Sequence, residues 1–445
     1  MLGPMEEVRV IRTLTLRLMP FLGICYIAAF IDRVNVGFAA LEMQADLGFS
    51  DTVYSLGAGM FFIGYFFFEV PSNLILEKVG ARLWIARIMI LWGIISSSMM
   101  FVESAWAFYA LRFLLGAGEA GFFPGIILYL TYWVPSEYRS RTVALFMAAA
   151  ALSGVVGAPI SGLLLDYPQL GLRGWQWLFL VEGIPPVVLG IAVLAWLPNG
   201  PPEARWLSVA EREWLAARIE KEGAERARAS GHLSLWQALA DRKVLLLSLV
   251  YFLIVIGGYG LDLFMPKLLA VAFPDVSKSV LGLLAAIPPL YTIPVMLFWG
   301  RSSDRRRECN WHVALPAFWA AAGLALASLP IPPLVALAAL TLAVSGRWAG
   351  IGPFWGLPTA YLTGTAAAGG IAMINSIGNL GGFAGPYVMG VFRDLTGDYA
   401  TGLRLLSVAF VLGGLLALRV RVKQTAATVA AVDSITPPRA VPEQP

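Results

Sequence analysis

Two arginines lie inside stretches of sequence that are otherwise apolar enough to cross a membrane, and each shares its stretch with an acid. Arg33 directly follows Asp32, and Arg112 precedes Glu119 by two helical turns. An arginine near the centre of a bilayer costs about 2.5–3.5 kcal/mol on insertion scales, so such residues usually face a wet cavity on an ion or substrate path. The four charges therefore predict an anion site beside a proton site.

The spacing of these residues indicates which side chains can act together. Arg112, Gly116 and Glu119 are separated by four and three residues, which places them along one face of a helix. Gly116 leaves room between the charges, so we expect Arg112 and Glu119 to find different partners; the alternative is that they neutralise charges on the first helix. Asp32 and Arg33 are adjacent, hence about 100° apart around their helix, and should also have different partners.

These two kinds of side chain have complementary chemistry. The planar guanidinium of Arg33 or Arg112 can make two parallel charge-assisted hydrogen bonds to a carboxylate, and it keeps its charge when partly desolvated. Burial favours the neutral form of a carboxylic acid, so Asp32 or Glu119 could load a proton. We therefore expect an organic anion as substrate and protons as the coupling ion, with no other cofactor.

The chain as a whole has the composition of a membrane protein. Of its 445 residues, 58% are hydrophobic and 13% are charged, which excludes a soluble globular protein of ordinary composition. A helix needs about 20 apolar residues to cross the bilayer, and the alternating pattern of barrel strands is absent from the sequence. The sequence predicts an all-α membrane protein with twelve transmembrane helices. They are expected to begin near Leu16, Thr52, Leu83, Ala107, Arg141, Gln176, Val244, Val280, Trp311, Leu334, Ala367 and Gly402.

The basic residues fall mainly on one side of these expected spans. Of the 32 Lys and Arg residues, 24 lie in the N-terminus, the loops after even-numbered spans and the C-terminus, five lie opposite, and three lie inside the spans. The positive-inside rule then puts both termini in the cytoplasm, with the protein in the cell (inner) membrane. Nucleic acid is not an expected partner, because the basic residues are scattered over short loops.

One long polar interruption divides the twelve spans into two sets of six. It carries a charged helix over about residues 208–228, where Ser208 and Glu211 fit a capping box. We expect an N-terminal six-helix bundle over residues 1–197 and a cytoplasmic connector over 198–243. A C-terminal six-helix bundle over 244–423 and a disordered cytoplasmic tail over 424–445 follow.

Landmarks recur between the two halves at a constant offset. Glu77 and Asp304 end corresponding spans and differ by 304 − 77 = 227, while Pro159 and Pro386 differ by 386 − 159 = 227. This predicts an internal duplication, as in transporters that rock two pseudo-symmetric bundles about a central site.

Several short motifs accompany this repeat, and they resemble the major facilitator superfamily and, within it, the anion:cation symporter family. That family includes phthalate, tartrate, hexonate and hydroxyphenylacetate permeases and sialin-type carriers. The motifs are Asp32-Arg33-Val34-Asn35, Glu69-Val70-Pro71-Ser72-Asn73, Arg112 with Gly116 and Glu119, Gly352-Pro353-Phe354-Trp355, Asn375-Ser376-Ile377-Gly378-Asn379-Leu380-Gly381-Gly382, and the loop residues Glu77, Lys78, Arg82, Asp304, Arg305 and Arg307.

The resemblance implies roles for individual residues. It implies that Arg33 and Arg112 bind substrate, whereas Asp32 and Glu119 carry protons. The charged loop motif should act as a gate, in which the acid at each helix end holds the basic residues of its own half when the transporter is open outward.

Further candidates for the substrate site are polar or aromatic. Asn375 and Asn379 form a polar stripe whose amides can hold hydroxyl or carboxylate groups, although packing through neighbouring glycines is the alternative. Tyr65, Tyr259 and Trp355 are candidate walls of the site.

Asp262 and Arg347 carry charge into the second half. Subtracting 227 places them at Asn35 and Ala120, nearly at the depth of the first-half charges. Either the two neutralise each other, or Arg347 is a second clamp for a carboxylate.

These observations predict a proton-coupled symporter that imports an organic carboxylate by alternating access, the substrate being tartrate-like or another dicarboxylate, a sugar acid or an aromatic acid. The alternatives are an organic anion antiporter, since residues 154–162 loosely resemble the antiporter signature of the superfamily, and an uncoupled facilitator. An enzyme is not expected, because the spans carry no nucleophile–base–acid set and no metal-ligand cluster. We expect a monomer whose partners are the anion, protons and the bilayer.

Overall fold

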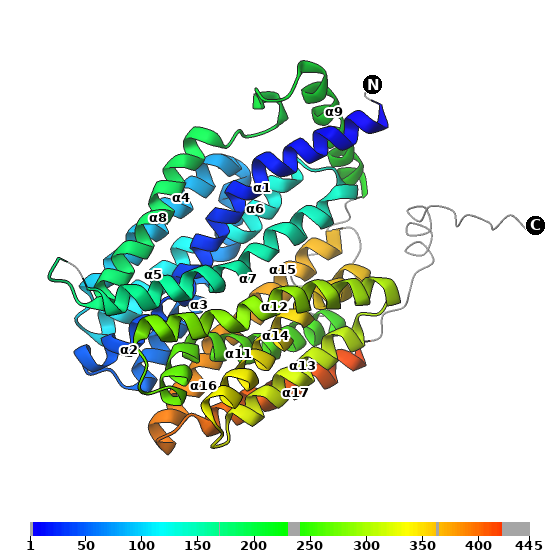
Figure 1. The fold of residues 1–445 in the computed structure, drawn as a ribbon. Helices are drawn as coiled ribbons and strands as arrows, with labels where there is room; N and C mark the ends of the chain where they lie inside the picture. The colour runs from blue at the N-terminus through cyan, green and yellow to red at the C-terminus, as the bar shows by residue number, and fades with distance from the viewer. Residues whose placement is uncertain (1–2, 169, 230–240, 362–364, 421–445) are drawn as a thin grey trace, which may run out of the picture.

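The structure, a computed structural model, describes residues 3–168, 170–229, 241–361 and 365–420, and these residues are almost entirely helical (Figure 1). Ten helices in these ranges are long and apolar enough to cross a membrane. α13 and the pair α15–α16 bring the helical passages to twelve, each close to its predicted position. The all-α prediction with twelve transmembrane helices is confirmed.

The first half holds α1 to α8. Its helices are α1 (Pro4–Val34), α2 (Val36–Leu47), α3 (Asp51–Val79), α4 (Ala81–Ser98), α5 (Ala105–Glu119), α6 (Phe122–Thr131), α7 (Ser136–Asp166) and α8 (Gly174–Trp196). The second half holds α11 (Arg242–Ala272), α12 (Lys278–Arg306), α13 (Asn310–Ala327), α14 (Pro333–Tyr361), α15 (Thr365–Asn379), α16 (Gly381–Thr396) and α17 (Ala400–Arg419).

Three of the twelve passages are interrupted where their polar residues lie. α1 gives way to α2 at Asn35, α5 to α6 just after Glu119, and α15 to α16 just after Asn379. The second break is set by Gly121, whose φ of +88° lies in the left-handed region, and a Cβ there would overlap Ser72. Interrupted helices in membrane transporters commonly line a substrate or ion site, because free backbone groups need a cavity or protein partner.

Corresponding helices of the two halves begin with the same local device. The hydroxyl of Ser50 caps α3 by accepting from the amide of Val53 at 3.2 Å, and that of Ser277 caps α12 by accepting from Val280 at 3.3 Å. The caps are 277 − 50 = 227 residues apart. A serine at this position satisfies an amide that the first helical turn leaves free. The offset found in the sequence therefore recurs at helix starts.

Helices of each half pack mainly on one another, and two seams join the halves. In the first half α3 packs on α5 and α4 on α8, and in the second α13 packs on α14 and α17. The seams are α7 with α12 and α3 with α16. A Cβ on Gly162 of α7 would overlap the backbone of Lys278, so glycine is what allows α7 and α12 to approach closely.

The connector helix α9 (Val209–Ala229) docks on the first half. The predicted capping box is present, since the amide of Ser208 donates to Glu211 at 2.9 Å and the amide of Glu211 donates to the Ser208 hydroxyl at 3.3 Å. The Ser208 bonds and the guanidinium of Arg9, 3.1 Å away, hold the pKa of Glu211 below its ordinary value. Residues 230–240 and the predicted tail lie outside the described residues, and the domain boundaries stay a prediction.

We call the end of the molecule that carries the N-terminus and α9 the connector side, and the opposite end, where α16 leads into α17, the loop side (Figure 1). On the loop side each half supplies an acid to the first turn of a helix in the other. Asp394 accepts from the amides of Asp51 and Thr52 of α3, at 3.1 and 2.7 Å. Asp166 accepts from the amides of Lys278 and Ser279 of α12, at 3.2 and 2.7 Å.

Two ion pairs reinforce these contacts, Lys267 with Asp51 and Lys278 with Glu42. Amides at a helix N-terminus favour an anion because they are free donors and the helix dipole is positive there. The halves are therefore held together on the loop side by a reciprocal, nearly symmetric set of charges.

Removing these acids should open the loop side. In an Asp166→Ala/Asp394→Ala double variant we expect the closed loop side to be destabilised by roughly 1 kcal/mol per acid, because the hydrogen bonds of each acid are charge-assisted but partly solvent-exposed. Spin labels at Phe101→Cys and Leu329→Cys, on a Cys309→Ser background, should report a larger population of long distances. An unchanged distance distribution contradicts the assignment.

Candidate functional site

Arg33 lies where the two halves meet, with partners from both. Its guanidinium pairs with Glu119 of α5, and Nη1 donates to the hydroxyl of Tyr259 on α11 at 3.1 Å. The rings of Phe61 and Tyr65 lie 5.3 and 5.5 Å from its Cζ atom, within range of cation–π attraction. A cation, an acid and three aromatic rings thus meet at the centre of the molecule.

Arg112 is fully buried on α5, yet its hydrogen bonds are incomplete. Nη2 donates to the carbonyl oxygen of Ala58 at 3.2 Å, and the ring of Phe61 lies 5.2 Å from Cζ. Nε and Nη1 have no hydrogen-bond partner in the part of the chain that the structure describes, and the same holds for Nε of Arg33 and Oε2 of Glu119. Buried polar atoms are normally bonded, so this cluster has capacity to bind a further polar group.

Asp32 is separate from this cluster and has its own donors. Its carboxylate accepts from Nε1 of Trp92 and the hydroxyl of Ser96, each at 2.7 Å, and from Nδ2 of Asn35 at 3.3 Å. The side chain is fully buried. The prediction that Asp32 and Arg33 have different partners is confirmed.

The prediction that Gly116 leaves room between the charges of its helix is wrong. A Cβ on Gly116 would overlap the carbonyl oxygen of Phe61, so the absent side chain makes room for the backbone of α3 instead. Arg112 and Glu119 do diverge as expected, and Glu119 neutralises Arg33 of the first helix, which is the alternative stated for it above.

Asp262 and Arg347 face each other and form an ion pair across α11 and α14. Arg347 is 5% exposed, and its Cζ lies 4.9 Å from the ring centre of Tyr259 and 4.8 Å from that of Trp348. Of the two alternatives, the arrangement is that of mutual neutralisation. Tyr259 connects this pair to Arg33, since it contacts both cations.

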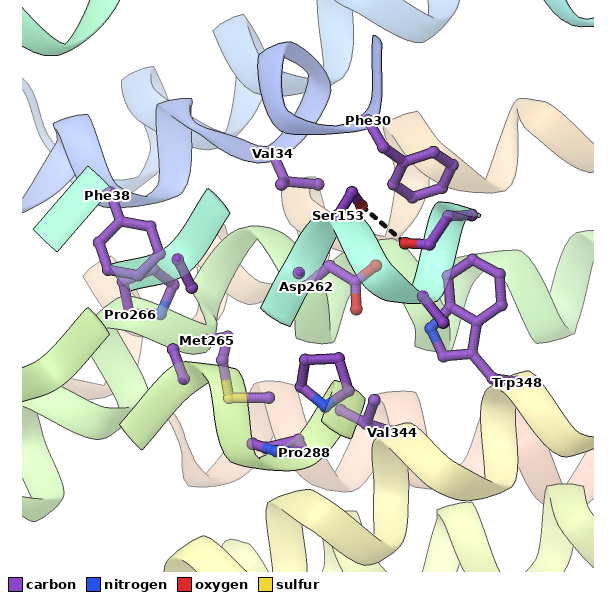
Figure 2. Close-up of a pocket in the computed structure, with 16 residues that line it drawn as sticks. Phe30, Val34, Phe38, Ser153, Asp262, Met265, Pro266, Pro288, Val344 and Trp348 are labelled. Carbon is purple, nitrogen blue, oxygen red and sulfur yellow. Dashed lines mark hydrogen bonds between the residues drawn. The ribbon is translucent and has the colours of Figure 1, made fainter. Parts of the chain in front are cut away.

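An apolar pocket lies beside these charges, between α1, α2 and α7 of the first half and α11, α12 and α14 of the second (Figure 2). Asp262 is the charged residue in its wall, among side chains such as Val34, Met265 and Pro288. Phe30 and Trp348 also line it, and their rings are 5.8 Å apart. The pocket provides apolar volume next to the charged centre.

The remaining predicted substrate residues lie at different places. Tyr65 contacts the guanidinium of Arg33 through its ring. The ring of Trp355 instead packs 5.1 Å from that of Tyr251. Nδ2 of Asn375 donates to the carboxylate of Glu69 at 2.7 Å. Asn379 ends α15 and is half-buried.

The predicted gating residues lie at the connector-side ends of their helices. Glu77 and Lys78 are exposed at the end of α3, and Arg82 donates to the backbone carbonyl of Leu194 in α8. Asp304, Arg305 and Arg307 end α12 and are exposed. The gating role stays a prediction.

Two buried acids were not assigned a role from the sequence. Glu69 belongs to the motif Glu69-Val70-Pro71-Ser72-Asn73. Glu182 of α8 is 6% exposed and accepts from the hydroxyl of Ser161 at 2.7 Å. The sequence does indicate a functional position for both, because each is an acid inside an otherwise apolar span. Their hydrogen-bond partners, Ser161 and Asn375, could not be predicted, since they are not neighbours in the sequence.

This fold, with a charged centre reached by both halves, is that of a multi-span membrane transporter. Residues 22–386 match the Major Facilitator Superfamily, so the chain belongs to that superfamily and is a transporter rather than an enzyme. The predicted membership is confirmed.

Relatives of known name agree with this assignment. A protein of Agrobacterium vitis named "Putative tartrate transporter" is 50% identical over 413 residues, covering 93% of this chain and 94% of its own. A "Quinolone resistance transporter" of Acinetobacter baumannii is 41% identical over 411 residues, covering 92% and 94%. The inward-facing, unoccupied structure of a bacterial homologue of the human lysosomal transporter Spinster shares the fold, with a TM-score of 0.74 at 17% identity, covering 91% of this chain and 96% of that one.

Breaking the pair in the second half should cost more than removing it. We expect Arg347→Leu to lower the free energy of unfolding by about 3–5 kcal/mol, because it leaves Asp262 as an uncompensated acid. The Asp262→Leu/Arg347→Leu double variant should be nearly as stable as wild type. Thermal unfolding in detergent measures both. A double variant less stable than Arg347→Leu contradicts mutual neutralisation.

Proposed function

We propose that this transporter imports an organic carboxylate together with protons, by alternating access across the inner membrane. The observation that carries the proposal is the buried guanidinium of Arg112, in which two nitrogens have no hydrogen-bond partner among the described residues. The partly satisfied Arg33 contacts the same Phe61 ring. A carboxylate is the ligand whose geometry and charge best match guanidinium donors.

Charge balance supplies the coupling. Arg33 and Arg112 are balanced by Asp32 and Glu119 when both acids are ionised. A proton on Glu119 removes its charge and weakens its hold on Arg33, which leaves a net positive site for an anion. Release of the anion restores the pair and expels the proton. Binding of the proton and of the carboxylate thus favour each other.

The first substrate to test is tartrate, because the A. vitis relative bears that name at 50% identity. Arg347 is neutralised by Asp262, so the first-half arginines are the primary carboxylate clamp. The half-buried amides of Asn375 and Asn379 would then bind hydroxyl or further carboxylate oxygens.

The sides follow from the distribution of basic residues. With the connector side in the cytoplasm, the loop-side contacts of Asp166 and Asp394 close the path to the outside. The Glu77 and Asp304 motifs would take over on the cytoplasmic side when the loop side opens.

Antiport is the second candidate. The name of the A. baumannii relative favours it, because resistance to a drug calls for lowering its concentration in the cell. The two candidates differ in the direction in which a proton gradient moves the anion.

Uptake by the purified protein in proteoliposomes tests the proposal. An inward proton gradient should drive radiolabelled tartrate above its equilibrium concentration. Asp32→Asn and Glu119→Gln should abolish accumulation while retaining exchange of tartrate for tartrate, because they remove a proton site and keep the shape. Concentrative uptake by both variants contradicts the coupling, and proton-driven efflux of the anion establishes antiport.

Tartrate affinity tests the clamp. Arg33→Ala and Arg112→Ala should each weaken binding about 100-fold, the scale of a lost buried charge contact. Arg306→Ala, an exposed cation at the end of α12, is the control and should bind like wild type. Equal affinity in all three variants would falsify the proposed clamp.

A further inference from the structure

The carboxylate of Glu69 joins the two halves on the connector side of the charged centre. Its Oε1 atom accepts from Nδ2 of Asn375 at 2.7 Å and its Oε2 atom accepts from the hydroxyl of Ser376 at 3.1 Å. Glu69 belongs to α3 and is 5% exposed, and both donors belong to α15 of the other half. Both oxygens of one acid are thus filled from across the interface.

The position of Glu69 on α3 connects it to the substrate site. Phe62, Tyr65 and Glu69 are three and four residues apart and share one face of the helix. The ring of Phe62 packs 4.4 Å from that of Tyr259, and the ring of Tyr65 lies 5.5 Å from Cζ of Arg33. Glu69 therefore lies one helical turn beyond Tyr65, an aromatic residue that contacts Arg33, toward the connector side.

A purely structural role does not account for an acid at this position. Phe67, Phe68 and Val70 around it are exposed and apolar, as expected of residues facing lipid. A carboxylate in such a span is costly, and a glutamine could bond to the same amide and hydroxyl without the cost. The acid is suited to a contact that must compete with another anion.

We propose that Glu69 is an internal substitute for the substrate carboxylate, an inference that rests on the proposed function. In the empty carrier it occupies Asn375 and Ser376 and holds the halves together on the connector side. An entering carboxylate takes over these donors and displaces Glu69, because the Ser376 hydroxyl has a single hydrogen and cannot donate to two anions. Glu69 thus stabilises the closed empty carrier and lowers the apparent affinity for substrate.

The first test needs no substrate. Spin labels at Val79→Cys of α3 and Arg306→Cys of α12, with Cys309→Ser, report the separation of the halves on the connector side in the empty protein. Glu69→Ala should raise the ratio of long to short distances about tenfold, the scale of one hydrogen bond to a charged group. Ser376→Ala should shift it in the same direction, and the double variant should add little to Glu69→Ala. A distribution in Glu69→Ala equal to that of wild type overturns the proposal.

The second test uses tartrate as the probe. Glu69→Ala should bind tartrate about tenfold more tightly, slow net uptake and retain tartrate exchange, because only net uptake requires the return of the empty carrier. Glu103→Gln, an exposed acid in a loop, should behave like wild type. Unchanged or weaker binding overturns the proposal.

Two further outcomes are separable. If Glu69→Ala does not fold, Glu69→Gln keeps the volume and one acceptor and should show the same changes to a smaller extent; no change in either readout overturns the proposal. If wild type does not bind any of a panel of mono- and dicarboxylates, the proposed function fails, while the distance measurement still decides whether Glu69 closes the connector side.

Discussion

The structure depends on keeping two arginines charged at the centre of a bundle of apolar helices. Arg33 and Arg112 cannot lose their protons, so the protein must supply compensating groups at the same depth. It does so unequally. Among the described residues, Arg33 receives Glu119, a tyrosine hydroxyl and aromatic faces, whereas Arg112 receives one backbone carbonyl and one ring. In the proposed function, this imbalance lets the site accept an anion and respond to a proton on Glu119.

The polar contacts between the halves differ in kind along the length of the molecule. On the loop side they are acids on helix amides, as with Asp394 on α3 and Asp166 on α12, together with the ion pairs of Lys267 and Lys278. At the centre they are aromatic and cationic, through Tyr259. On the connector side the contact of Glu69 is a carboxylate held by neutral donors. Contacts of modest strength at both ends suit the proposed alternating access, in which each end opens in turn.

Much of the fold could be predicted from the sequence, because hydropathy and helix length indicate the spans and the repeat indicates two corresponding sets of six. The adjacency of Asp32 and Arg33 was also enough to separate their partners, since neighbouring residues of a helix diverge by about 100°. Helix period gives the face of a residue but not the helix it meets. For that reason the prediction for Gly116 is wrong, and the sequence does not indicate Trp92 and Ser96 as partners of Asp32. The break after Glu119 depends on the positive φ of Gly121, a backbone geometry that hydropathy does not report.

The central claim is that a proton on Glu119 and an anion at Arg33 and Arg112 favour each other's binding. Calorimetric titration of the protein with tartrate, in buffers of different ionisation enthalpy at one pH, measures the number of protons taken up on binding. Wild type should take up protons, and Glu119→Gln should take up fewer while still binding tartrate. Tartrate binding without proton uptake in wild type, or with equal uptake in both proteins, would contradict the coupling through Glu119.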